Sequence, residues 1–162
     1  MEAKQKIKTN WENDTRLSRL FQALKKSGGT PRLVGGVVRD TILGIPQDDY
    51  DVAINLTPDS VVQSLKSERI HVIPTGIDHG TVTAIVDANP YQITSIRMDL
   101  KTDGRRAEVA FTEDWVLDAS RRDFTINALY ADLDGTIYDP FGGIDDLEHN
   151  CVRFIGDPIA RI

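Results

Sequence analysis

Residues 33–51 read LVGGVVRDTILGIPQDDYD, and the interpretation of the whole chain depends on this stretch. A short apolar run leads into Gly35 and Gly36, and a segment with helical spacing follows. A strand that turns into a helix at two glycines exposes backbone N–H groups and the positive end of the helix dipole, which favours an anion. Arg39 lies in the first turn of that helix, where its guanidinium can reach the same anion. The stretch therefore predicts a phosphate-binding turn, although a tight turn with a surface arginine would explain the glycines alone.

Two carboxylates, Asp49 and Asp51, follow the expected helix. Alternate residues of a strand point to the same face, so these two side chains are expected to lie side by side. Like charges this close repel each other unless a cation lies between them, and Mg²⁺ takes one or two carboxylates together with phosphate oxygens. Combined with the glycine turn, the pair predicts a metal–triphosphate site, and the alternative is a solvated acidic turn. The stretch contains neither a Walker A lysine nor a GxGxxG pattern.

The composition limits the class of protein. With 162 residues, of which 40% are hydrophobic, the chain is expected to form a single domain. The net charge of −6 argues against a protein that holds nucleic acid mainly through its phosphates. One cysteine and three scattered histidines indicate neither a disulfide nor a zinc site. No apolar run is long enough for a membrane span, and the N-terminus does not resemble a secretion signal, so we expect a cytoplasmic protein.

The hydrophobic pattern predicts a mixed α/β (α+β) domain, in which helices flank a small sheet of four or five strands that is mainly antiparallel or mixed. Helices are expected over residues 13–27, 37–43, 57–66 and 118–130. Strands are expected near residues 32–34, 50–54, 81–87, 91–96, 130–133 and 136–139.

The opening stretch closely resembles the N-terminal head of class II tRNA nucleotidyltransferases and bacterial poly(A) polymerases, which has the pattern LVGGxVRDxxLGxxxxDxD. Later segments resemble this family in the same order: DHGTVTAIVD, ITSIRMD, TDGRRAEVAFTEDW, RRDFTINALY, DPFGGIDDL and VRFIGDPIARI. The resemblance implies a nucleotidyltransferase-type head over residues 30–156. A helical extension over residues 1–29 would precede it, and the start of a neck region over residues 157–162 would follow.

The resemblance also implies roles for individual positions in the opening stretch. Gly35, Gly36 and Arg39 would contact the triphosphate of ATP or CTP, and Asp49 and Asp51 would hold two catalytic Mg²⁺ ions. The resemblance therefore implies that Asp49 and Asp51 are the catalytic residues of this chain. The preceding residue, Asp48, stands where the family often has a lysine and is not expected to be a ligand.

The RRD motif implies a second group of nucleotide-binding residues, which select a ribonucleotide and hold its phosphates: Arg122, Asp123 and Asn127, with Arg121 as a further candidate. Their spacing of about one helical turn would direct them at one ligand. The alternative is a capped amphipathic helix whose apolar side chains fill the core, and both can hold together. Arg97, Asp99, Arg105 and Arg106 are further candidates in a polar segment that corresponds to a flexible family segment linked to the switch between nucleotides.

The resemblance implies the addition of CMP or AMP to the 3′ end of tRNA, known as CCA addition, by two-metal-ion nucleotidyl transfer. Gln92 departs from the family because relatives often carry glutamate at this position, which places the second metal and full activity in question. In the family, the sequence beyond the position of Ile162 contains an EDxxR segment that recognises the base and helices that hold the tRNA. The alternatives are a poly(A) polymerase head, or a non-catalytic or split-enzyme subunit that needs a second polypeptide.

Overall fold

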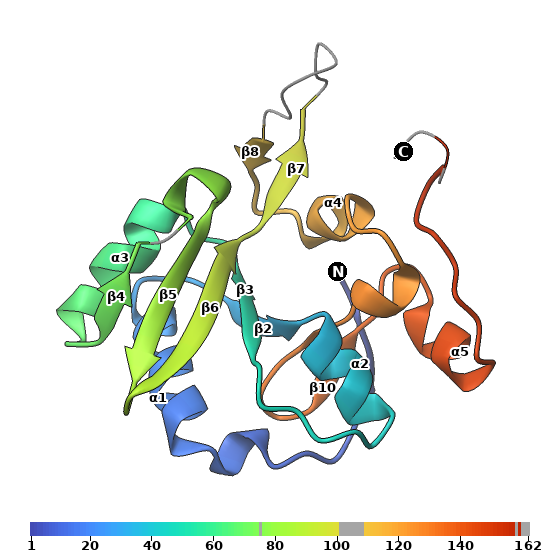
Figure 1. The fold of residues 1–162 in the computed structure, drawn as a ribbon, viewed down its shortest axis with the longest axis horizontal. Helices are drawn as coiled ribbons and strands as arrows, with labels where there is room; N and C mark the ends of the chain where they lie inside the picture. Colours follow the sequence, from blue (N-terminus) through green and yellow to red (C-terminus); the bar gives the residue numbers. More distant parts are fainter. Residues whose placement is uncertain (75, 101–108, 158, 160–162) are drawn as a thin grey trace.

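The computed structural model describes residues 1–74, 76–100, 109–157 and 159. Within these ranges, an eight-stranded sheet forms the centre of the molecule, with the strand order β1-β10-β9-β2-β3-β6-β5-β4 (Figure 1). Its strands are β1 (Ala3–Lys6), β2 (Pro31–Val34), β3 (Asp51–Ile54), β4 (His71–Ile73), β5 (Thr81–Val86), β6 (Asn89–Ser95), β9 (Tyr130–Ala131) and β10 (Thr136–Tyr138). Among these strands only β3 and β6 pair in parallel.

The mixed, mainly antiparallel sheet confirms the predicted fold class, but the predicted number of four or five strands was wrong. β1 and β4 were missed because β1 is polar and exposed along its whole length and β4 has only three residues, so neither shows a buried alternation. A separate two-stranded sheet, β7 (Arg97–Asp99) and β8 (Val109–Phe111), projects from the body of the molecule (Figure 1).

The helices lie mostly around the central sheet. They are α1 (Thr15–Lys26), α2 (Gly36–Ile42), α3 (Pro58–Ser67), α4 (Trp115–Ser120) and α5 (Gly143–Glu148), with short 3₁₀ segments η1 (Trp11–Asn13), η2 (Ile77–His79) and η3 (Thr125–Asn127). None of the helices in the described part of the chain is both long enough and apolar enough to cross a membrane.

Helices α1 and α3 begin where the sequence predicts, because each has a side-chain cap. The Asp14 carboxylate accepts hydrogen bonds from the first backbone N–H groups of α1, and Thr57 caps α3 in the same way. The two helices are joined by the buried Ser64 hydroxyl, which donates to the Ala23 carbonyl at 2.7 Å. Residues 1–29 thus supply a helix to the main hydrophobic core as well as the edge strand β1.

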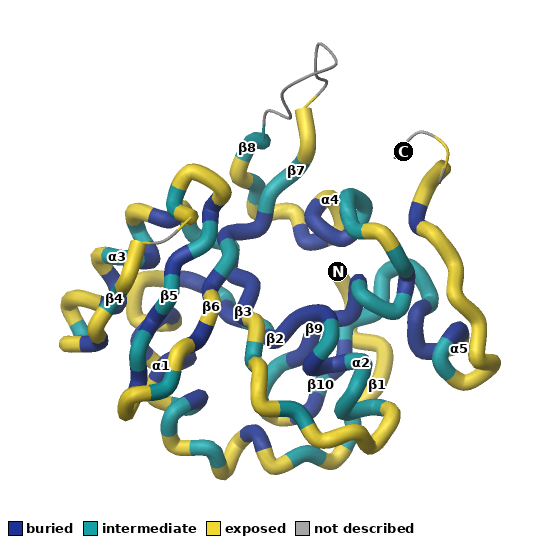
Figure 2. Tube along the Cα trace, in the orientation of Figure 1, coloured by how far each residue is buried: buried dark blue, intermediate teal, exposed yellow. Residues whose placement is uncertain are grey.

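The sheet is covered on both faces. Along β2 and β3, Leu33 and Val52 belong to the larger hydrophobic cluster, whereas their neighbours Val34 and Ala53 belong to a second cluster with Trp115 of α4. Because successive side chains of a strand point to opposite faces, the two clusters lie on opposite sides of the sheet. Figure 2 shows the resulting burial of β2 and β3 at the centre of the molecule.

The predicted helix over residues 118–130 was wrong, since α4 ends at Ser120 and only the short segment η3 follows before β9. Contacts with the C-terminal segment replace the helical hydrogen bonds. The Ile155 N–H donates to the Asp123 carbonyl at 2.8 Å, and the Thr125 N–H donates to the Arg153 carbonyl at 3.0 Å. The Asp123 carboxylate also accepts from the Phe124 N–H at 2.7 Å, a local bond that competes with a helix.

Candidate active site

The turn between β2 and α2 has the predicted form. Gly35 has φ = +74° and ψ = −128°, a conformation that side chains strongly disfavour, and it occupies the N-cap of α2. Its N–H donates to the Leu129 carbonyl at 3.0 Å, which fixes the turn against the segment that follows η3. The glycine turn is thereby held beside residues that lie about ninety positions later in the chain.

A polar pocket of about 480 Å³ opens at this turn. Ten of the residues singled out in the sequence line it: Gly35, Gly36, Arg39, Asp51, Gln92, Arg97, Arg121, Arg122, Asp123 and Asn127. Val34, Thr81 and Thr94 complete the lining. Among the described residues, four arginines therefore face the pocket together with two aspartates, a balance that suits a polyanion carrying a metal ion.

The acidic part of the pocket lies on the sheet. Asp51 and Gln92 are direct neighbours in the parallel pairing of β3 with β6, and Thr81 and Thr94 are neighbours in the pairing of β5 with β6. Burial raises the pKa of Asp51, the charge of Asp49 raises it further, and Arg122 opposes both effects. The charge of Asp49 therefore acts on Asp51, although Asp49 is not part of the lining of this pocket.

Asp49 itself lies just before the strand, because β3 begins at Asp51. It lines a neighbouring cavity of about 430 Å³ together with Asp48 and two tyrosines, Tyr50 and Tyr91. The structure therefore places the two predicted metal ligands in different cavities, because only Asp51 belongs to the strand on which both were expected. Asp99 is at the end of β7 and does not line the arginine pocket, and Arg105 and Arg106 lie outside the described residues.

Arg39 is held in place by two neighbours. Its Nε donates to Asp40 at 2.8 Å, and its terminal nitrogen Nη1 donates to the Asn127 side-chain oxygen at 2.6 Å. The Asn127 amide in turn donates to the Asp123 carboxylate at 3.3 Å. These contacts link the glycine turn to the RRD segment and direct residues from two distant parts of the sequence into one pocket.

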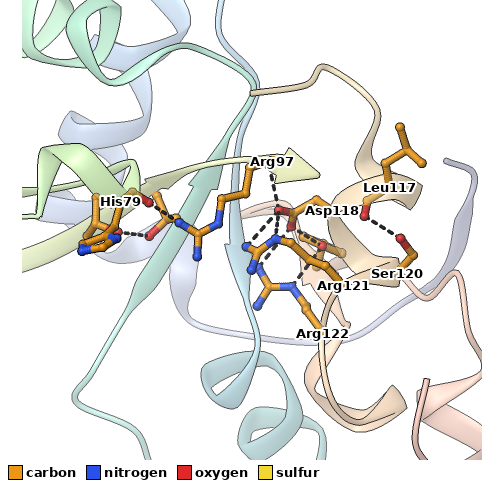
Figure 3. A network of polar contacts seen from close by, with 10 residues as sticks. His79, Arg97, Leu117, Asp118, Ser120, Arg121 and Arg122 are labelled. Carbon is orange, nitrogen blue, oxygen red and sulfur yellow. Dashed lines mark hydrogen bonds and ion pairs between the residues drawn. The ribbon is translucent and has the colours of Figure 1, made fainter. Parts of the chain in front are cut away.

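Arg121 and Arg122 are held by a residue that the sequence reasoning missed, Asp118 of α4 (Figure 3). Each arginine places an Nη2 nitrogen 3.1 Å from the Asp118 carboxylate, which is fully buried. The Tyr130 hydroxyl donates to the same carboxylate at 2.7 Å. The signal in the sequence was the spacing of Asp118, three and four residues before the two arginines, which is typical of ion pairs on a helix.

The surroundings of this cluster shift the pKa values of Asp118 and Tyr130 in opposite directions. Burial acts to raise the pKa of Asp118, but Arg122, Arg121 and the Tyr130 hydroxyl outweigh it, so that the pKa lies below its ordinary value. Burial also raises the pKa of Tyr130, and the nearby Asp118 adds to this effect. The tyrosine therefore remains a hydrogen-bond donor at neutral pH.

Arg97, at the start of β7, is the fourth arginine that lines the pocket in the described part of the chain. Its backbone N–H donates to Asp118 at 3.0 Å, and its guanidinium donates to the His79 carbonyl (Figure 3). Burial lowers the pKa of Arg97, and the nearby Arg121 lowers it further. Its Nε is buried without a hydrogen-bond partner in the described part of the chain.

The donor set fits Mg²⁺ bound jointly with phosphate. No group of three or more histidine, cysteine, aspartate or glutamate side chains is arranged to hold a metal among the described residues. Asp51 lines the pocket, and Asp49 would add a second carboxylate if it turned toward it; Mg²⁺ commonly takes one or two carboxylates when substrate phosphates and water complete its coordination. Gln92, beside Asp51, adds an oxygen without charge.

The glycine turn, the sheet order and the arginine pocket define a polymerase-type head domain. Residues 31–153 match the family described as the poly A polymerase head domain, and the chain belongs to this family.

Relatives of known function are CCA-adding enzymes. The chain is 42% identical over 147 residues to the human mitochondrial CCA tRNA nucleotidyltransferase 1, an alignment that covers 90% of this chain and 34% of that protein. It is 40% identical over 144 residues to the CCA-adding enzyme of Levilactobacillus brevis, and this alignment covers 88% of this chain and 35% of that protein. The crystal structure of the Bacillus stearothermophilus CCA-adding enzyme in complex with CTP matches with a TM-score of 0.77 at 33% identity, covering 93% of this chain and 34% of that one. The chain thus spans about a third of the length of these relatives.

Proposed function

We propose that this chain is the catalytic head of a template-independent RNA nucleotidyltransferase that adds CMP or AMP to the 3′ end of tRNA. The observation that carries the proposal is the pocket itself, in which the glycine turn, four arginines and Asp51 converge. The 3′-hydroxyl oxygen of the RNA would form a bond to the α-phosphorus of CTP or ATP. The bond from that phosphorus to the pyrophosphate oxygen would break, pyrophosphate would leave, and the hydroxyl proton would pass to solvent water.

Each part of the pocket has a task in this reaction. The N–H groups at the glycine turn and the guanidiniums of Arg39 and Arg122 would hold the triphosphate. Asp123 and Asn127, which are bonded to each other, would face the ribose. Asp49 and Asp51 would hold two Mg²⁺ ions, which supply positive charge that lowers the pKa of the attacking hydroxyl and stabilises the leaving pyrophosphate.

Two alternatives remain within this proposal. A poly(A) polymerase head would use the same pocket, and the matched family is described by that name. A non-catalytic subunit, or one that needs a second polypeptide, is the other alternative, and the neutral Gln92 beside Asp51 is the observation that motivates it. A cytoplasmic location remains a prediction, since the human relative is named as mitochondrial.

The test is incorporation of labelled CTP or ATP into a tRNA that lacks its 3′-terminal CCA, in the presence of Mg²⁺. A poly(A) primer in a parallel reaction separates CCA addition from polyadenylation. Asp51→Asn is expected to abolish incorporation, and binding of CTP and ATP is measured separately by calorimetry. Binding without incorporation, restored by adding the neck and body of a relative, would support the two-chain alternative. Absence of nucleotide binding by the wild-type chain would overturn the proposal.

A further inference from the structure

Asp118 lies behind the wall of the pocket. Its side chain is fully buried and is not part of the pocket lining, whereas the arginines it contacts are. A buried carboxylate is costly unless several donors surround it. Asp118 has such donors, and they come from three segments of the chain.

Each of the two carboxylate oxygens of Asp118 accepts hydrogen bonds from two of these donors. Oδ1 accepts from the Arg97 backbone N–H at 3.0 Å and from Arg121 Nε at 3.1 Å. Oδ2 accepts from Arg122 Nη2 at 3.1 Å and from the Tyr130 hydroxyl at 2.7 Å. In Figure 3 the side chains of Arg121 and Arg122 converge on this one group. A single anion thus fixes the start of β7, the end of α4 and β9 relative to one another.

Tyr130 contacts both Asp118 and Arg122 and helps to hold them together. Its hydroxyl donates to Asp118 and accepts from Arg122 Nε at 3.2 Å. Its buried ring packs edge-on against Trp115, with the ring centroids 5.3 Å apart. Trp115 also contacts the guanidinium of Arg32, which lies 4.4 Å from the ring centroid. The hydroxyl that orients Arg122 therefore belongs to a ring that cannot easily move.

We infer that Asp118 is a positioning residue for the proposed nucleotidyl transfer, because it orients Arg121 and Arg122 before the triphosphate binds. The inference rests on the proposed function. Two arginines side by side repel each other, and a shared anion offsets this repulsion and restricts the conformations of their long side chains. Holding them in one arrangement removes that entropic cost from the binding of phosphate. Asp118 cannot do this by touching the nucleotide, since the arginines lie between it and the pocket.

The first experiment compares three variants of the whole chain: Asp118→Asn, Tyr130→Phe and Asp146→Asn. Asp146 is the matched control, because it is also a buried aspartate bonded to an arginine, Arg153, at 3.1 Å, and neither Asp146 nor Arg153 lines the arginine pocket. Each variant is measured for unfolding by urea and for its affinity for CTP and for cytidine in the presence of Mg²⁺. Asp118→Asn is expected to weaken CTP binding about tenfold, as is typical of a coupling through a charged contact. Cytidine affinity is expected to stay unchanged, and Asp146→Asn is expected to lose stability but not CTP affinity.

The second experiment is a double-mutant cycle with Arg122→Ala. If Asp118 acts through the arginines, Asp118→Asn will weaken CTP binding less in the Arg122→Ala background than in the wild type, because one of the two arginines that Asp118 positions is already gone. Additive losses in the cycle, or equal losses for CTP and cytidine, would overturn the inference. If Asp118→Asn does not fold, Tyr130→Phe takes its place in both experiments. A wild-type chain that binds no CTP refutes the proposed function, whereas wild-type affinity in both Asp118→Asn and Tyr130→Phe refutes only the positioning role.

Discussion

Asp51 and Gln92 are direct neighbours across the parallel junction between β3 and β6. The two side chains lie in one pocket with Thr94, which belongs to the same face of β6. A carboxylate at the position of Gln92 would stand against Asp51 as a second negative charge. The amide instead leaves Asp51 as the carboxylate on this part of the pocket wall.

Gln92→Glu is expected to strengthen the binding of Mg²⁺ and weaken the fold when no metal is present. Like charges directly opposite on neighbouring strands destabilise a sheet, here by roughly 0.5–1 kcal/mol. The measurements are urea denaturation with and without Mg²⁺ and the Mg²⁺ concentration that half-saturates CTP binding. Gln63→Glu is the matched control, because Gln63 is exposed on α3, away from the pocket. An equal change in both variants would contradict the prediction.

Asp51→Asn is expected to raise the stability of the metal-free protein at neutral pH while removing incorporation. The pKa of Asp51 is raised in the folded state, so its favourable contribution to stability is present when it is protonated and is lost as the pH rises through that pKa. The gain from the asparagine should therefore disappear as the pH falls below the unfolded value of ~3.9. Urea denaturation in EDTA at several pH values measures this, and a gain that persists in acid would count against it.

Asp118→Asn is expected to show the opposite pH dependence. The pKa of Asp118 is lowered in the folded state, so its stabilising effect is present above the unfolded value of ~3.9 and is lost as the pH falls through the folded pKa. Because the substitution breaks a buried ion pair, the loss at neutral pH should be about 3 kcal/mol. Denaturation at neutral and acid pH is the measurement. A loss that does not shrink in acid would show that packing, and not charge, is responsible.

Gly35→Ala and Gly36→Ala form a matched pair at the turn. Gly35 has a positive φ of +74°, so alanine there should cost about 1–3 kcal/mol. Gly36 is in the first turn of α2, and a Cβ added to it would meet only an Arg39 nitrogen at 3.5 Å, so its alanine variant should keep its stability. Thermal unfolding of both proteins, followed by CTP binding, gives the comparison. Equal stability of the two variants would contradict the assigned turn.

Much of the fold could be predicted because its signals are local. Asp14 and Thr57 cap helices, and the glycines after β2 stop a strand, each through contacts within a few residues. The β5–β6 hairpin also follows the predicted alternation, and its turn at Asp87 and Ala88 adopts positive φ values. The sequence by itself therefore determined most of the strands and helices and the residue types that the pocket requires.

Only the tertiary structure decided how those residues meet. The pairing of Arg39 with Asn127 joins segments far apart in the chain, and no periodicity encodes that contact. The helix expected after Asp118 ends early because the C-terminal segment offers better hydrogen-bond partners to Asp123 and Thr125. The buried Asp118 is costly alone and becomes favourable only where two arginines and Tyr130 surround it. Local interactions set the elements, whereas the desolvation of buried charge and the pairing of distant strands set the site.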